Sequence, residues 1–262
     1  MLAWRAFRSA LMMHLRLYTF QQGRVISSFA MPAVMAAIAV LVLRQGHPGS
    51  EQYFRVMVGG GLAGMWGGVL GTAVMTLRRE REWYGTLPLL TVVPAPLESV
   101  YGGYLVAEAS AGFLGIAAGL GVGALLLHGS VRLAAPATLV VSLPVAALAL
   151  AAVAFPIMPL VLYVPLLTRW INGMESPVWI LAGFLFPVAL LPAWASPASH
   201  ALPAYWATEA LRQAGVNGSG WGRAASLWSA ALGLCLVYAA AGLVLLRSVV
   251  RQLHRSGALV TE

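Results

Sequence analysis

The chain has little charge, and it contains no lysine and no aspartate. Charged residues are 9% of its 262 residues, its 16 basic residues are all arginines, and its 8 acidic residues are all glutamates. A P-loop needs the lysine of GxxxxGK[ST], so the usual nucleotide site is excluded. Catalysis by intramembrane aspartates is excluded as well, and a Ser-His-Asp triad would need glutamate as its acid.

Histidine and cysteine are also scarce, which limits metal and redox chemistry. The five histidines never stand four residues apart, so the zinc motif HExxH is absent. Cys235, the only cysteine, cannot form a disulfide within the chain and lies in an apolar run, where a small packed side chain is expected. No nucleophile–base set or metal-ligand cluster is recognisable, so no catalytic or metal-binding residue is predicted.

Apolar residues, in contrast, are abundant. They make up 60% of the chain, and the mean hydropathy is +0.82, whereas soluble domains are about 45–50% apolar. This composition predicts an all-α polytopic membrane protein with one transmembrane domain over residues 1–262. Six segments have the roughly 20 residues that a bilayer requires: 25–43, 56–77, 100–127, 137–167, 178–195 and 225–246.

The arginines predict the orientation of the chain, because cytoplasmic loops are enriched in basic residues. With the N-terminus inside, the cytoplasmic segments hold most of them: Arg5, Arg8, Arg16, Arg24, Arg78, Arg79, Arg81, Arg169, Arg247, Arg251 and Arg255. Both termini are then cytoplasmic, and residues 247–262 form a tail. The net charge of +8 is explained by orientation and anionic lipid, so no nucleic-acid partner is expected. The arginine-rich, alanine-rich composition is typical of a high-GC bacterium, and a bacterial plasma (inner) membrane is the expected location.

The first 24 residues are expected to form an amphipathic interfacial helix rather than a signal peptide. At helical spacing, one stripe holds five apolar or aromatic residues: Trp4, Phe7, Leu11, Leu15 and Tyr18. The alternative is a positively charged flank that only sets the orientation.

Two further segments carry a local signal. The second span is rich in glycines at small-xxx-small spacing, which lets helices approach closely, either within the chain or in a dimer: Gly60, Gly64, Gly67, Gly68 and Gly71. Between the last two spans, residues 204–214 follow Pro203 and precede Gly215. They predict an external or re-entrant half-helix, with a structured surface loop as the alternative.

The connection TLRREREWYGTLPLLTVVPAPLES, residues 76–99, contains five consecutive charges from Arg78 to Glu82. These charges are expected to continue the second span beyond the membrane, and Gly85 ends that helix well. Residues 87–93 then form a short apolar helix, which Pro94 and Pro96 stop. An apolar helix on the cytoplasmic side needs a partner groove or the bilayer interface.

This connection resembles the first cytoplasmic loop of ABC-2 type transporter permeases. The family pattern is a turn rich in E-R-E, then G-T-L, two leucines, a proline and a glycine that opens the next span. Gly85, Thr86, Leu87, Leu89, Leu90, Pro94 and Gly102 or Gly103 match it in order. LPAYWATEALR, residues 202–212, resembles the family's proline-aromatic-EALR pattern before the last span. The chain departs at Pro88, where the family usually has an acidic residue.

The resemblance implies that the short helix is a coupling helix seated in a separate ATP-binding subunit. The residues implied in this contact are Glu80, Arg81, Glu82, Gly85, Thr86, Leu87, Leu89, Leu90 and Pro94. Which glutamate contacts the ATPase is left open. Two permeases, identical or related, and two ATPases form the implied unit. ATP and Mg²⁺ belong to the ATPase, and this chain binds no cofactor and is not itself an enzyme. The implied activity is export of a hydrophobic or amphipathic substrate such as a drug, antibiotic, lipid or glycan.

Glu108 is an acidic residue well inside a predicted span, and such residues are functional candidates by default. It lines a substrate path or carries a proton, or else it is a hydrogen-bonded structural residue. A proton-coupled secondary carrier and an integral membrane enzyme are the rival functions, and neither has a full set of residues to support it.

Overall fold

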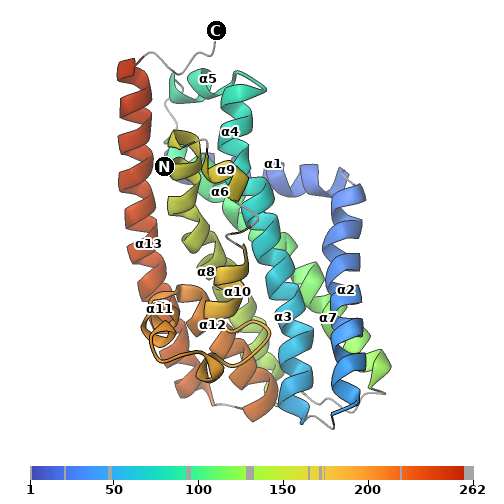
Figure 1. Cartoon of the computed structure of the whole chain (residues 1–262). Helices are drawn as coiled ribbons and strands as arrows, with labels where there is room; N and C mark the ends of the chain where they lie inside the picture. Colours follow the sequence, from blue (N-terminus) through green and yellow to red (C-terminus); the bar gives the residue numbers. More distant parts are fainter. Residues whose placement is uncertain are drawn as a thin grey trace.

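The computed structural model of the protein is an elongated bundle of helices (Figure 1). It describes residues 2–20, 22–46, 49–92, 96–127, 133–164, 166–170, 173, 175–218 and 220–256. Within these ranges the chain forms helices and turns and no β-strand. The prediction of an all-α fold is therefore confirmed.

The first part of the chain runs along the length of the bundle and returns. α1 (Leu2–Phe20) lies across one end, and α2 (Gln22–Arg44) runs from there to the opposite end (Figure 1). The return path is α3 (Ser50–Gly68), the π-helical turn η1 (Val69–Val74) and α4 (Met75–Glu82). The end of the bundle that holds α1, α4 and α5 is called the α5 end below.

The middle of the chain runs along the bundle and back a second time. After α5 (Leu87–Val92), α6 (Leu97–Ala111) and α7 (Phe113–Leu126) run away from the α5 end (Figure 1). α8 (Pro136–Tyr163) runs back and forms the centre of the bundle, since it packs against α6, α12 and α13.

The last part begins with short helices and ends with a long one. The short elements are α9 (Leu167–Trp170), α10 (Glu175–Leu181), η3 (Val188–Leu190), α11 (Ala195–Ala201), α12 (Pro203–Arg212) and the π-helical η4 (Gln213–Asn217). They lead from the α5 end to the opposite end, called the α12 end (Figure 1). α13 (Trp221–Ser256) then returns to the α5 end, and it continues the chain as helix well beyond residue 247, where a tail was predicted.

Among the described residues, four helical stretches are long and apolar enough to cross a membrane: Ser50–Glu80, Leu97–Leu126, Pro136–Tyr163 and Trp221–Arg255. They correspond to the predicted second, third, fourth and sixth spans. The predicted first span lies in α2, where the apolar helical stretch Ser28–Arg44 is shorter than the others.

The prediction of a continuous fifth span over residues 178–195 is wrong. α10 ends at Leu181, and Gly183 follows with a φ of 70°. Pro187 then introduces a 3₁₀ turn, η3. A left-handed glycine and a proline without an N–H both end an α-helix. Apolar composition made this segment resemble a span, although its backbone turns repeatedly.

Helices approach closely where glycines leave out a side chain. A Cβ placed on Gly61 of α3 would lie 2.5 Å from the backbone nitrogen of Ile116 on α7. A Cβ on Gly103 of α6 would lie 2.6 Å from the carbonyl oxygen of Phe7 on α1. α1 is therefore held tightly against α6, with Ala10 and His14 buried between them.

Candidate functional site

The break between α4 and α5 is built by a glycine cap. Gly85 has a φ of 61°, a conformation that glycine adopts without steric cost. The backbone N–H of Thr86 donates a 2.8 Å hydrogen bond to the carbonyl oxygen of Glu80, across the end of α4. This bond joins residues six apart, one more than the closing bond of a Schellman cap. The chain therefore turns sharply before Leu87, and α5 is a separate helix.

α5 is anchored on one side and bare on the other. Leu87 is fully buried, and Leu90 packs partly against the core. Leu89, in contrast, is 67% exposed. Trp83 and Tyr84, in the turn before Gly85, are also exposed. These three exposed apolar residues, Trp83, Tyr84 and Leu89, are called the α5 surface below.

A buried hydrogen bond ties this region to α6. Glu80 is buried near the end of α4, and its carboxylate accepts a hydrogen bond from the hydroxyl of Tyr101. Tyr101 is fully buried and stacks edge-on against Tyr104, at 5.7 Å between ring centres. The carboxylate of Glu80 therefore points into the bundle and toward α6.

The other residues predicted for this contact are placed as follows. Glu82 faces solvent and forms a 2.7 Å ion pair with Arg78, one turn earlier on α4. Arg81 also belongs to α4. Pro94 lies outside the described residues. Of the two candidate glutamates, Glu82 is thus the one on the surface.

The glycines of the second span do not share one environment. Gly60 and Gly64 lie against Pro32 of α2. A Cβ on Gly67 would lie 3.5 Å from a carboxylate oxygen of Glu175, and one on Gly68 would lie 3.7 Å from Glu108. Gly71 is exposed, with no neighbouring atom within 4 Å of an added Cβ.

Glu108 is buried and pairs with a histidine from the start of the chain. The His14 Nε2 lies 2.7 Å from Glu108 Oε1, and both side chains are almost completely buried. The ring of Tyr104 stands 5.0 Å from that of His14. This pair joins α1 to α6 inside the bundle, which the sequence alone did not reveal.

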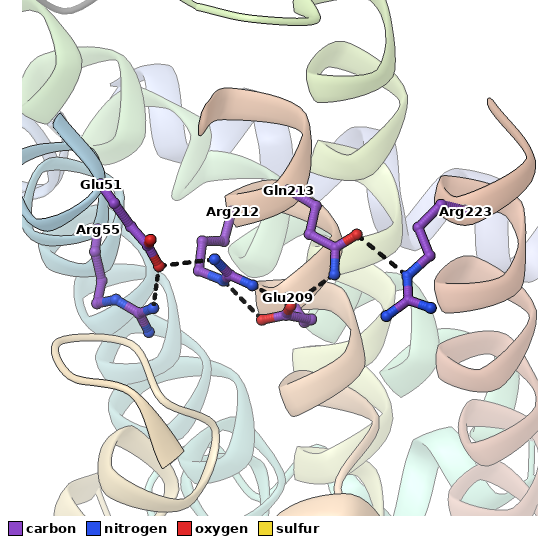
Figure 2. A network of polar contacts seen from close by, with 6 residues as sticks. All are labelled: Glu51, Arg55, Glu209, Arg212, Gln213 and Arg223. Atoms are coloured by element: carbon purple, nitrogen blue, oxygen red, sulfur yellow. Dashed lines mark hydrogen bonds and ion pairs between the residues drawn. The ribbon is translucent and has the colours of Figure 1, made fainter. Parts of the chain in front are cut away.

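A second polar cluster lies at the α12 end (Figure 2). Arg212 of α12 stands between two carboxylates: its Nη1 lies 2.7 Å from Glu51 Oε1 on α3, and its Nε lies 2.8 Å from Glu209 Oε2. Gln213 donates to Glu209 at 2.7 Å and accepts from Arg223 of α13 at 3.4 Å. The cluster thus connects α3, α12 and α13.

The electrostatics of this cluster favour charged side chains. Burial alone would raise the pKa of Glu209, but hydrogen bonds from Arg212 and Gln213 outweigh it and hold that pKa below its usual value. Glu209 and Glu51 in turn raise the pKa of Arg212, chiefly through its hydrogen bond to Glu209, although burial opposes this rise. A cavity of about 290 Å³ adjoins the cluster, lined also by Tyr205, Thr208 and the turn at Gly183.

Sequence reasoning missed the partners in these contacts. Tyr101, His14 and Glu51 each meet a residue far away in the chain, and no local pattern announces such a pair. The sequence shows the EALR motif, but only the fold brings its Arg212 to Glu51. Among the described residues, no group of three or more histidine, cysteine or acidic side chains is placed to hold a metal ion.

Comparison with models of known protein families gives no match for this chain, and comparison with curated protein sequences gives none either.

Proposed function

We propose that the chain is the membrane subunit of an ATP-driven transporter of the ABC-2 permease type. The α5 surface is the observation that carries this proposal. Leu89 is exposed on a short helix whose other side is fixed by buried Leu87. A bare leucine beside an exposed tryptophan and tyrosine marks a site for a partner. The partner proposed is a separate ATP-binding subunit, because this chain lacks the lysine of a nucleotide site.

The distribution of arginines supports a cytoplasmic position for the α5 end. α1, α4, α9 and the last turns of α13 meet there and carry most of them: Arg5, Arg8, Arg16, Arg78, Arg79, Arg81, Arg169, Arg247, Arg251 and Arg255. The α12 end holds Arg44, Arg55, Arg212 and Arg223. The positive-inside rule then puts α5 where a soluble ATPase can reach it.

We further propose six crossings of a bacterial plasma membrane, with both termini in the cytoplasm. Four are the long apolar helices described above, and α2 is a fifth. The remaining crossing is the broken path through α9 and α10, which contacts α8 and α3.

Movement of the ATPase would reach the membrane helices through the contacts around α5. Leu87 packs into the bundle core, and Glu80 is hydrogen-bonded to Tyr101 on α6. A push on the α5 surface therefore acts on α4 and α6 together. Two permeases, identical or related, and two ATPases would make the working unit. An amphipathic or hydrophobic substrate, such as a drug, antibiotic, lipid or glycan, would be exported between them.

The test is purification of the tagged chain from the cells that naturally express it, in a mild detergent. We expect an ATP-binding protein to copurify and the complex to hydrolyse ATP. Leu89→Glu should remove that protein by placing a charge on the contact. Leu190→Glu changes a similarly exposed leucine at the α12 end, and the ATP-binding protein should still copurify with this variant. Full copurification with Leu89→Glu would overturn the proposal.

The buried His14–Glu108 pair favours one alternative, a proton-coupled carrier, because ionisable pairs inside membrane proteins often relay protons. Vesicles containing this chain alone distinguish the two functions. Substrate-linked proton uptake without an ATPase, abolished by Glu108→Gln, would favour the carrier. No such uptake is expected if the chain works only with its ATPase.

A further inference from the structure

An apolar groove of about 630 Å³ runs along the outside of the bundle between α6 and α13. Its floor is α8, against which both helices pack. Small residues on all three helices keep it open: Gly102, Ala151, Ala152 and Ala239. Leu105, Leu148 and Leu236 are among the larger apolar side chains that line it.

The groove has a charged end. At the α5 end, Arg247 of α13 donates a 2.7 Å hydrogen bond to Glu98 of α6, and both residues line the groove. The Arg247 side chain is still 62% exposed. Arg251, one turn further along α13, is exposed and lines an adjoining pocket of about 440 Å³. With Glu98 counted, this end keeps one net positive charge.

The dimensions of the groove suit a lipid chain. From Leu232 to Arg247, α13 advances about 22 Å at the helical rise of 1.5 Å per residue. One leaflet contributes about 15 Å of hydrocarbon, half of a bilayer core of about 30 Å. The groove is therefore long enough for an acyl chain that spans one leaflet, and the headgroup of that chain would lie at the charged end, beside Arg247 and Arg251.

We propose that this groove binds one anionic phospholipid of the cytoplasmic leaflet. An acyl chain fills the space over Ala151, Ala152 and Ala239, and the phosphate lies between Arg247 and Arg251. A second copy of this chain is a poorer occupant, because in the same membrane orientation it would bring its own arginine-rich α5 end to an already positive site. The proposal rests on the membrane placement given above, but not on the ATPase partner.

The direct test is native mass spectrometry of the purified full-length chain in detergent. The probes are palmitoyl-oleoyl phosphatidylglycerol, the matching phosphatidylcholine, and inorganic phosphate. We expect a one-to-one complex with phosphatidylglycerol, about fivefold weaker binding of phosphatidylcholine, and no complex with phosphate. Equal binding of the two lipids would overturn the role of the arginines. Binding of phosphate alone would overturn the role of the groove.

Four variants locate the site. Arg247→Gln removes the charge and Ala239→Phe fills the groove, and each should weaken the phosphatidylglycerol complex about fivefold or more. Arg255→Gln and Val237→Phe make the same changes on α13 at exposed positions outside the groove and should keep the complex. Circular dichroism and elution volume identify any variant that is not folded.

Cys235 provides a second readout, because the chain's single thiol lines the groove. Phosphatidylglycerol should slow the reaction of Cys235 with N-ethylmaleimide, and it should do so in a Leu89→Glu background as well. If phosphatidylglycerol still slowed the reaction of Cys235 to the same extent in both Arg247→Gln and Ala239→Phe, the proposed binding site would be wrong. A second outcome is that Cys235 reacts more slowly as the protein concentration rises, and that dimer masses are seen for the natural chain but not for Ala239→Phe. That outcome would show that a second copy occupies the groove.

Discussion

The hydroxyl of Tyr101 on α6 donates a hydrogen bond to the buried carboxylate of Glu80 at the end of α4. This contact joins the segment beside α5 to α6, through a residue 21 positions further along the chain. Because Glu80 is buried, its carboxylate depends on this donor far more than a surface carboxylate would.

Tyr101→Phe should therefore destabilise the protein. The ring and its packing against Tyr104 are kept, but a buried acceptor loses its donor, which costs about 1–3 kcal/mol. We expect the thermal midpoint in detergent to fall by several degrees, since about 2–4 °C follow from each kcal/mol at this size. Tyr84→Phe removes an exposed hydroxyl and is the matched control. Equal midpoints for the two variants would contradict the contact.

The ion pair between Arg212 and Glu51 should be energetically coupled. A double-mutant cycle with Arg212→Gln and Glu51→Gln should give a coupling energy of about 0.5–3 kcal/mol, because the pair is partly buried and shares partners. The pair Arg78–Glu82 is the comparison. It is formed within one helix at the surface and should give only about 0.3–0.5 kcal/mol. Equal couplings would mean that the network at the α12 end does not connect α3 to α12.

The same network should make stability depend on pH. The pKa of Glu209 is lower in the folded protein than its ordinary value, so its contribution is complete above that ordinary pKa of about 4.3. It is lost as the pH falls through the lower, folded pKa. The thermal midpoint of the natural chain should therefore drop below about pH 4. Glu209→Gln should have a lower thermal midpoint than the natural chain at pH 7, and the gap between the two midpoints should narrow at low pH. A gap that widens on acidification would contradict the assigned pKa shift.

Two glycine substitutions should have opposite effects. Gly61→Ala places a methyl group 2.5 Å from the backbone of Ile116, where neither helix can yield easily. Such overpacking costs about 1–3 kcal/mol. Gly121→Ala, on the exposed side of α7, meets no atom within 4 Å and should gain up to about 1 kcal/mol of helix propensity. Thermal unfolding of both variants measures the difference, and a destabilised Gly121→Ala would be the unexpected result.

Some features could be predicted from the sequence because a single residue produces them locally. The break before α5 was predictable, because Gly85 acts on its own backbone and the apolar residues after it are adjacent. A short helix after Pro203 was predictable for the same reason, since a proline can open a helix, and α12 spans Pro203–Arg212.

Two kinds of feature could not be predicted. The predicted fifth span was an apolar run, and composition did not show that Gly183 takes a left-handed conformation there. The partners of Glu80, Glu108 and Arg212 all come from other helices. Their positions depend on how the helices pack, and no spacing within one segment specifies that packing.

A crosslink from Leu89 is the sharpest test of whether the α5 surface contacts an ATP-binding subunit. The chain's only cysteine is replaced by Cys235→Ala, and Leu89→Cys then carries a benzophenone maleimide in the native membrane. Leu190→Cys at the α12 end is the control. We predict that irradiation joins the Leu89 position, and not the control, to a separate protein that azido-ATP also labels. Crosslinks from Leu89 to lipid alone, or to a protein that binds no nucleotide, would contradict the account.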